Sequence, residues 1–366
     1  MPGRFHAELL AEYLCKKSFD VKIYSSTPRF YFSHDLRDKV IFVPMVLQIL
    51  RKITGKKIPN ILHNLEFSFF DWVISRFMRK PDIVYGFAGV SKFCGSRYSN
   101  TLYILDRACP HIEFQTSLMK RESKKLGFSY KHDNRLKERM KVEYELADKI
   151  FIPSEYTKSS FQKYTNLSHK TYLTNLDGKV TPSEEITNCA NFTIGYLGGD
   201  NIIRKGLYYL LKAFDDDSVN DVTLMIRASD SSILSSDELI QIVNSRENIV
   251  FKKRYEKIED FYKEIDVLCV PSVDEGWGMV VLEALANGVP VICTSNVGSS
   301  VLIKEGVNGF VLDPCDFMSI REKVNYLEEN KEELALLKKN SYESYTDFIQ
   351  SGQSYYDRLD NSILFD

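Results

Sequence analysis

The sequence predicts an α/β protein made of two doubly wound domains, each built on a parallel sheet. Its length of 366 residues suits two domains of ordinary size. In both halves, apolar runs of strand length alternate with helical stretches, a pattern typical of parallel sheets covered on both faces. Residues 176–191 are polar and rich in turn-forming residues, so we interpret them as the linker between the domains.

In the first half, an amphipathic helix over residues 5–17 should lead into a short strand over 21–25. A doubly wound domain normally has a strand before such a helix, and we expect this first strand to be missing. Further strands are predicted over 83–87, 101–105 and 149–152, with a charged helix over about 134–148.

Two stretches of the first half, 45–57 and 68–80, combine apolar or aromatic side chains with Lys and Arg. They suit helices lying on anionic lipid, and equally helices packed in the core with their cations reaching outward. Residues 1–180 hold 31 Lys and Arg against 18 Asp and Glu, a balance of +13 that leaves −15 for the remainder. Nucleic acid, an anionic membrane, a phosphorylated acceptor or an ordinary solvated surface would each fit this asymmetry.

Composition places the chain among soluble globular proteins, with 44% apolar and 27% charged residues. Its seven cysteines are scattered without a Cys-x-x-Cys pair, which favours a reducing compartment over disulfides or zinc. No apolar run approaches the roughly 18 residues of a spanning helix, and the start lacks the apolar core of a signal peptide. We therefore expect a cytoplasmic protein, or one that is peripheral at the inner face of the membrane.

The second half repeats the alternation of strands and helices. Strands are predicted over 192–197, 222–227, 249–252, 267–270 and 291–293, and helices over 206–214, 237–244 and 279–286. The aromatic tail, residues 342–366, is longer than a second domain needs, and we expect it to cross back to the first domain.

The stretch 271–292 is the one around which we expect the chemistry to be organised. Residues 279–286 are apolar except for Glu283, which indicates a buried helix entered through glycines and stopped by Gly288 and Pro290. Backbone N–H groups at such an entry attract phosphate or sugar oxygens. A carboxylate inside this helix needs donors, and a ribose diol offers two. Alternatively, Glu283 accepts from backbone N–H groups and Glu275 is a surface acid.

Two other segments carry weaker signals. Residues 198–206, GGDNIIRKG, lie between a predicted strand and a helix, and their glycines and cations suit a diphosphate. Their spacing is neither the Rossmann nor the P-loop fingerprint. His111 follows the strand at 101–105, where open α/β sheets bind ligands, so it is a candidate sugar or phosphate contact or an incidental loop residue.

With these motifs in view, the chain resembles the retaining glycosyltransferases of family 4, which have the GT-B fold of two Rossmann-like domains facing across a cleft. The specific part is Glu275 and Glu283 within EGWGMVVLEALANGVPVI. Supporting parts are TIGYLGGDNIIRKGLYYLLKAF, ELADKIFIPSEYTKSSF and VGSSVLIKEGVNGFVLDP. The match is strong in the second half and looser in the first.

The resemblance implies roles for individual residues. Glu275, Lys205 and His111 would be the catalytic side chains, with Glu275 and His111 near the donor sugar and Lys205 on the phosphates. Glu283 would bind the ribose diol, while Gly3 and Arg4 would lie on the acceptor side. The remaining donor contacts would be Gly198, Gly199, Arg204, Gly276, Trp277, Gly278, Met279 and Val280. Many relatives carry Arg where this chain has Gly199, and Arg204 is a candidate replacement.

The resemblance also implies domains and partners. Residues 1–180 would bind the acceptor, 190–345 the donor, and 346–366 would form the helix that crosses back. The donor would be a UDP- or GDP-linked sugar, and the acceptor a glycan or lipid-linked hydroxyl in bacterial surface polysaccharide assembly. No metal cofactor and no nucleic-acid partner are expected, whereas an anionic membrane surface is. A phosphorylase or epimerase on the same fold, or an impaired paralogue that only binds nucleotide-sugar, would be the alternatives.

Overall fold

The computed structural model describes residues 7–47, 49, 60–176, 180, 182–183, 189–198, 201–227, 234, 236–252, 257–351 and 358, with the backbone only at 60, 61 and 63. The chain divides into two compact units. Unit 1 comprises Met1–Thr116, Lys131–Ile152 and Ser160–Thr174. Unit 2 comprises Ser117–Tyr130, Pro153–Ser159 and Asn175–Asp366. All residues from 175 onward thus belong to unit 2, and this boundary lies near the start of the predicted linker.

The strands of unit 1 are all parallel and lie in two sheets. A four-stranded sheet has the order β3-β4-β5-β6, and β1 pairs separately with β2. Among the described residues no strand joins the two sheets, so the first strand that a doubly wound domain would have finds no counterpart there. The strands are β1 (Ile23–Ser25), β2 (Val40–Phe42), β3 (Ile83–Phe87), β4 (Leu102–Asp106), β5 (Lys149–Ile152) and β6 (Thr171–Leu173).

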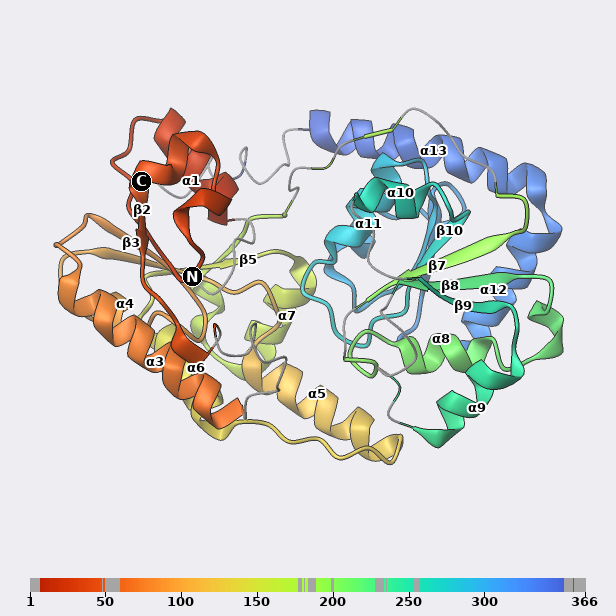
Figure 1. The fold of residues 1–366 in the computed structure, drawn as a ribbon, viewed down its shortest axis with the longest axis horizontal. Coiled ribbons are helices and arrows are strands. Elements are labelled where there is room, and N and C mark those ends of the chain that lie inside the picture. Colours follow the sequence, from red (N-terminus) through yellow and green to blue (C-terminus); the bar gives the residue numbers. More distant parts are fainter. Residues whose placement is uncertain are drawn as a thin grey trace. The chain divides into compact units, whose positions relative to one another are not determined.

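Helices of unit 1 pack on these strands around a core that includes Tyr103, Leu105, Ile150 and Phe161. The helix expected over 5–17 is present as α1, and the charged helix expected over 134–148 is α6 (Figure 1). Two helices are divided between the units: α5 begins in unit 1 and ends in a segment that groups with unit 2, and α7 begins in unit 2 and ends in unit 1. The helices are α1 (Ala7–Lys16), α3 (Asn60–Phe77), α4 (Lys92–Gly95), α5 (Ile112–Lys125), α6 (Asn134–Leu146) and α7 (Glu155–Tyr164).

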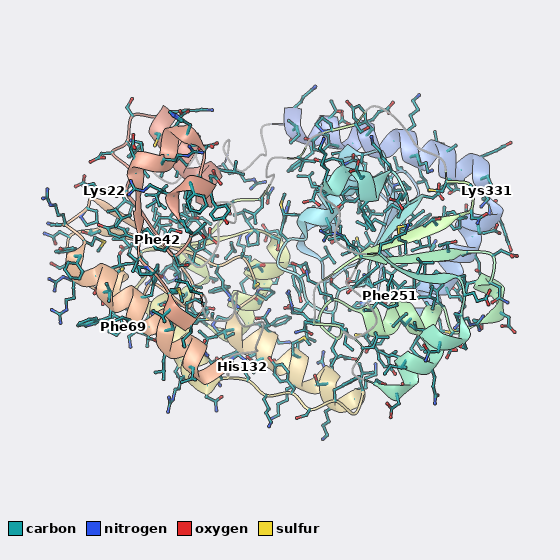
Figure 2. All side chains as sticks on the ribbon, viewed as in Figure 1. Lys22, Phe42, Phe69, His132, Phe251 and Lys331 are labelled. Carbon is teal, nitrogen blue, oxygen red and sulfur yellow. The ribbon has the colours of Figure 1, made fainter. Side chains whose placement is uncertain are left out.

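Helix α3 starts eight residues before the stretch predicted from sequence, and it is apolar on two faces. Phe70 and Ile74 pack in the core of unit 1, as the core interpretation predicted. Phe69, labelled on this helix in Figure 2, is 64% exposed. Leu62, Leu65 and Trp72 are exposed as well. Most of the other predicted basic–apolar helix, residues 45–57, lies outside the described residues.

Unit 2 contains a six-stranded parallel sheet in the order β12-β11-β10-β7-β8-β9. The sheet is doubly wound, as predicted, since the order runs outward from β7 in both directions. Every residue of β10 and β11 is buried, which is expected of central strands covered on both faces. The strands are β7 (Thr193–Leu197), β8 (Thr223–Arg227), β9 (Ile249–Lys252), β10 (Val267–Val270), β11 (Val291–Thr294) and β12 (Gly309–Leu312).

Helices cover both faces of this sheet (Figure 1). On one face lie α8 (Leu207–Ala213), α9 (Asp237–Ser245) and α12 (Phe317–Glu329), and on the other lie α10 (Ile258–Tyr262), α11 (Met279–Ala286) and α13 (Lys331–Gln350). A buried ion pair between Lys338 Nζ and Asp266 Oδ1, 2.6 Å long, fixes α13 to the edge of the sheet before β10. The same carboxylate accepts from the Thr193 amide.

The last helix that the structure describes is α13. It begins at Lys331, ends at Gln350, and groups with unit 2. Beyond residue 351 only residue 358 is described, so the crossing to the first domain stays a prediction. Of the helices that the structure describes, none has the length and apolarity needed to span a bilayer.

Candidate functional site

The glycine-entered helix of unit 2 forms over the residues predicted for it, Met279–Ala286. Its N-cap is Gly278, which has a φ of +92°, a left-handed conformation that glycine adopts without the steric cost of a side chain. At the other end Gly288 has a φ of +65°. The first amides of any helix lack intrahelical acceptors. Helix α11 therefore presents the N–H groups of Met279 and Val280 at its entry.

The loop before this helix is fixed by backbone hydrogen bonds. The Glu275 amide donates to the Asn296 carbonyl at 3.1 Å, and the Glu275 carbonyl accepts from the Gly298 amide at 3.0 Å. The Ser299 hydroxyl donates to the Trp277 carbonyl at 2.7 Å. These bonds hold the loop on both sides of the Glu275 side chain, so its carboxylate has a defined position.

Two cations meet Glu275 from the predicted phosphate loop. Lys205 Nζ donates to Glu275 Oε2, and Arg204 Nη1 lies 3.7 Å from the same oxygen. The Lys205 and Glu275 side chains are 25% and 14% exposed, so this pair is only partly open to solvent. The Arg204 carbonyl also accepts from the Val273 amide at 2.9 Å. The structure thus joins three of the predicted site residues, although they lie about 70 positions apart.

Gly206 explains why the two loops approach so closely. Its φ is +72°, and a Cβ built on it would lie 1.8 Å from the carbonyl oxygen of Pro271. Only glycine satisfies both conditions. The residue therefore brings Lys205 beside the loop that carries Glu275, and it also starts α8 as its N-cap.

Glu283 lies on α11, and its carboxylate accepts from a hydroxyl rather than from the backbone N–H groups of the alternative interpretation. Tyr262, the last residue of α10, donates to Glu283 Oε2 at 2.8 Å. Burial raises the pKa of Glu283, and nearby Glu259 raises it further, while the Tyr262 hydrogen bond and the charge of Arg227 lower it. Desolvation is the largest of these effects. The carboxylate is thus costly to bury and has few donors of its own, as the sequence suggested.

Two residues of this cluster were not predicted from sequence. Tyr262 belongs to a five-residue helix that no periodicity marked, and nothing in the sequence links it to Glu283. Arg227 is the last residue of β8. A lone cation at the carboxyl end of a predicted strand was a usable signal, because ligands of open α/β sheets bind there.

The other predicted donor contacts have different outcomes. Gly198 follows β7, and a Cβ there would lie 2.2 Å from the Tyr196 hydroxyl, so a larger residue would not fit. Trp277 is 2% exposed, which leaves only its backbone for a ligand. Gly199 lies outside the described residues, as do Gly3 and Arg4, so their predicted roles stay predictions.

His111 lies in unit 1, whereas Lys205, Glu275 and Glu283 lie in unit 2. It follows β4 and directly precedes α5, as expected from the strand before it. The residue is 2% exposed, and its ring contacts Tyr144, Phe161 and Tyr164. Burial, helped by the charge of Arg107, lowers the pKa of His111 to about 4. The imidazole is therefore neutral at pH 7, and its predicted contact with the donor sugar stays a prediction.

The acidic run at 215–217 engages neighbouring cations. Lys212 pairs with Asp215 at 2.9 Å, Arg321 with Asp216 at 2.7 Å, and Arg246 with Asp217 at 3.2 Å. Asp216 also caps the short helix that follows it. The run therefore serves local structure. Elsewhere in the described part of the chain, no group of three or more metal-binding side chains comes together.

Comparison with solved structures defines the class of fold. Sucrose-phosphate synthase from Thermosynechococcus elongatus aligns with a TM-score of 0.73 at 16% identity, over 98% of this chain and 93% of that one. HepE from Anabaena in complex with UDP-glucose aligns with a TM-score of 0.62 at 14% identity, over 92% and 94%. At such identities the likeness concerns the fold alone. The fold is GT-B, with two Rossmann-like α/β domains, as the sequence predicted.

The sequence comparison adds a family match that lies within unit 2. Residues 199–344, which include Lys205, Glu275 and Glu283, match the family of group 1 glycosyl transferases. CapM of Staphylococcus aureus, a capsular polysaccharide biosynthesis glycosyltransferase, is 34% identical over 143 residues, 37% of this chain and 37% of CapM. In two further relatives the match covers 54% and 51% of their length. The chain thus spans about a third to a half of the curated relatives it matches.

Proposed function

We propose that the protein is a retaining glycosyltransferase of family 4 that moves a sugar from a nucleotide diphosphate donor to a hydroxyl of a glycan or lipid-linked acceptor. The observation that carries this proposal is the cluster at the entry of α11. There Lys205 and Arg204 meet Glu275 beside the first amides of the helix, and Glu283 lies on the same helix. The match of residues 199–344 to group 1 glycosyl transferases supports it, as does the UDP-glucose bound to HepE.

The chemistry requires stabilisation of a leaving diphosphate. The bond between the anomeric carbon and the phosphate oxygen breaks, and its electron pair leaves with the diphosphate. Lys205, Arg204 and the amides of Met279 and Val280 supply preorganised positive charge for that group, so we propose that no metal is needed. The acceptor oxygen bonds to the anomeric carbon from the leaving-group face, and its proton passes to the departing phosphate oxygen. Configuration is retained in this scheme without an enzyme nucleophile.

In this scheme the site residues divide the donor between them. Glu283 binds the ribose diol, the amides after Gly276 bind the phosphate and sugar oxygens, and Glu275 approaches the sugar. His111 would face the same sugar from unit 1. Because His111 is neutral at pH 7, it would act as a hydrogen-bonding group and not as a cation.

The proposal for the acceptor is based on the net charge and the exposed apolar side chains of the first half of the chain. Residues 1–180 carry a balance of +13, and α3 exposes Leu62, Leu65, Phe69 and Trp72. A groove of about 490 Å³ lies between this helix and residues 43–47, and its lining is largely apolar. Arg76 lies over the Trp72 ring at 5.5 Å. An apolar helix face beside cations suits an anionic lipid surface, where each cation contributes about 1 kcal/mol.

We accordingly place the reaction at the inner face of the membrane, in the assembly of a bacterial surface polysaccharide. The name of CapM, a capsular polysaccharide biosynthesis glycosyltransferase, supports this setting. An anionic, lipid-linked glycan is the acceptor class that fits both the cations and the exposed apolar side chains.

The donor is tested with a panel of UDP-, GDP- and ADP-sugars, scored for binding and for slow release of free nucleotide, with and without EDTA. One donor should bind and turn over with the chelator present. If none binds at millimolar concentration, the proposal fails. Binding without turnover on any acceptor would favour an impaired paralogue. Cleavage that requires phosphate, or epimerisation without an acceptor, would favour a phosphorylase or an epimerase.

A variant tests the role of Glu283. Glu283→Gln should lower donor affinity by roughly 1.5–3 kcal/mol, the scale of a hydrogen bond to a charged group. An unchanged affinity together with a lower melting temperature would return Glu283 to a purely structural role.

The proposed binding to an anionic membrane is tested by co-sedimentation with anionic liposomes. Replacing Arg76, Arg79 and Lys80 with Ser should weaken binding. The matched control replaces Lys120, Arg121 and Lys124, exposed residues of α5, and removes the same charge away from α3. Equal effects of the two triple variants would show that charge alone matters, and no binding by the wild type would remove the membrane from the proposal.

A further inference from the structure

Arg227 occupies a distinctive place next to the phosphate loop of unit 2. It ends β8, and the register of the sheet pairs it with Leu197, the last residue of β7. Gly198 follows Leu197 directly and opens the glycine-rich turn. Strand ends of a parallel sheet lie at one edge, so Arg227 lies beside the start of that turn.

The surroundings of the guanidinium are polar but leave it without a partner. Burial raises the pKa of both Glu283 and Tyr262, and the charge of Arg227 offsets a smaller part of that rise. Its Nε is buried, and among the described residues no acceptor lies within hydrogen-bonding distance of it. A buried donor without an acceptor is costly, and such atoms in native structures usually have a reason. Arg227 is thus a cation at the end of β8 that influences Glu283 electrostatically and whose Nε has no acceptor among the described residues.

The two cations of the glycine-rich turn differ from Arg227 because each has a carboxylate nearby. Lys205 and Arg204 both approach Glu275, which offsets part of their charge. Glu283 and Glu259 add negative charge around α11 and α10. An anionic ligand that entered this acidic neighbourhood would need a cation with free donors. In the part of unit 2 that the structure describes around Glu283, Arg227 is such a cation.

We propose that Arg227 binds the phosphate next to the ribose of the nucleotide donor. The inference rests on the proposed function, because it takes Glu283 as the ribose contact. The helix entry at Gly278 would hold the outer phosphate, and Glu283 lies five residues further along α11, about 7.5 Å along its axis. The inner phosphate of a bound nucleotide lies between those two contacts. A guanidinium at the end of β8, opposite the residue before the glycine turn, offers a fork of N–H donors suited to phosphate oxygens.

Arginine at position 227 also fits the glycine at position 199, where the family resemblance would place an arginine. Residue 199 lies two positions after the last residue of β7. Arg227 would approach the phosphates from the adjacent strand end. Its role is then affinity for the phosphate and not only neutralisation of Glu283.

The test separates phosphate binding from charge neutralisation. Wild type, Arg227→Met and Arg227→Lys are titrated calorimetrically with UDP, UMP and uridine, and with GDP, GMP and guanosine. Arg121→Met is the matched control, since Arg121 is exposed on α5 of the same unit. We expect Arg227→Met to weaken the diphosphate and the monophosphate by roughly ten- to a hundredfold and to leave the nucleoside unchanged. Arg227→Lys should restore part of the loss, and Arg121→Met should bind like the wild type.

Three outcomes would overturn the inference while leaving the proposed function in place. These are an unchanged nucleotide affinity, an equal loss for the nucleoside, and a loss seen only with the diphosphate, which would move Arg227 to the outer phosphate. Circular dichroism and the melting temperature establish that each variant is folded. If the wild type binds no nucleotide at all, the proposed function fails, and this inference fails with it.

Discussion

Single side chains of unit 2 that lie far apart in the sequence come into contact, and these contacts define the candidate site. Glu283 was recognisable from sequence because a carboxylate in an apolar helix is expensive to bury. Its partner Tyr262 was not, because the contact depends on how α10 packs against α11. Lys205 and Glu275 were each predicted, yet their direct ion pair was not, because it depends on the approach of two loops at Gly206.

The Tyr262 hydroxyl should set the acidity of Glu283. Tyr262→Phe removes a hydrogen bond that favours the carboxylate, so the raised pKa of Glu283 should rise further. The pH below which nucleoside affinity declines should therefore increase. Uridine or guanosine is the suitable ligand, because neither carries a phosphate that titrates in this range.

Glu283→Gln serves as the control, since its nucleoside affinity should lack this pH dependence. A pH profile for Tyr262→Phe that coincides with the wild-type profile would show that the hydrogen bond has no influence on Glu283.

His111 should make unit 1 sensitive to acid. Its pKa is about 4 in the folded protein and about 6.5 in an unfolded chain, so the unfolded state binds the proton first as pH falls. The stability associated with the neutral ring is complete above pH 6.5 and is lost on acidification towards pH 4. The full loss is on the order of 3 kcal/mol. Urea denaturation at pH 7 and pH 4.5 should show a smaller loss for His111→Leu than for the wild type.

His34 provides the comparison, because its side chain is 92% exposed. His34→Leu should lose as much stability as the wild type between the two pH values. Equal losses in all three proteins would mean that His111 does not govern the acid response.

At the scale of elements, the sequence correctly predicted helices and strands whose own residues show a clear hydrophobic pattern. Helix α11 was predicted over its observed bounds, because apolar residues without alternation lie between glycines. Strands β5, β9 and β10 were also placed correctly. The edge strands β6 and β12 and the short helix α10 escaped prediction. They hold three to five residues, too few for a period to appear, and β6 and β12 are fixed by pairing with a neighbouring strand.

The link between β7 and α8 should depend on the absence of a side chain at Gly206. Gly206→Ala combines a φ of +72° with a Cβ placed on the carbonyl of Pro271. The left-handed conformation alone costs roughly 1–2 kcal/mol. The clash is with backbone, so the total loss of unfolding free energy should exceed about 2 kcal/mol. Chemical denaturation measures it.

Gly306 provides a matched control within the same unit. Its φ is +68°, but a Cβ there would meet nothing within 4 Å. Gly306→Ala should therefore show the conformational cost without the clash. If both variants lose the same stability, the close approach to Pro271 contributes nothing.

At the scale of the whole molecule, the alternation of strands and helices was sufficient to predict two doubly wound domains. It was not sufficient to predict that residues 117–130 and 153–159 group with unit 2. That grouping depends on tertiary contacts and not on local pattern. The charge asymmetry between the two halves is likewise visible in the sequence, whereas the exposure of Leu62, Leu65, Phe69 and Trp72 needed the structure.

Nucleotide binding should slow hydrogen exchange in unit 2. A ligand at one hundred times its dissociation constant stabilises the state that binds it by about 2.7 kcal/mol. We therefore expect saturating UDP or GDP to slow hydrogen exchange most strongly in peptides covering residues 201–213 and 271–286. Mass spectrometry after deuterium exchange measures this effect. Glu283→Gln should reduce the protection, and protection confined to residues 7–116 would contradict the assignment of the donor to unit 2.

The ion pair between Lys205 and Glu275 has a consequence for the order of events during binding. A phosphate oxygen that approaches Lys205 meets a competitor already in place, so the ammonium exchanges one anion for another. The net affinity gained from Lys205 is then the difference between two contacts. Under the proposed function, Glu275 would become available to a sugar hydroxyl only after that exchange. The carboxylate would then act as an internal competitor, which disfavours free sugars and admits ligands that carry a phosphate.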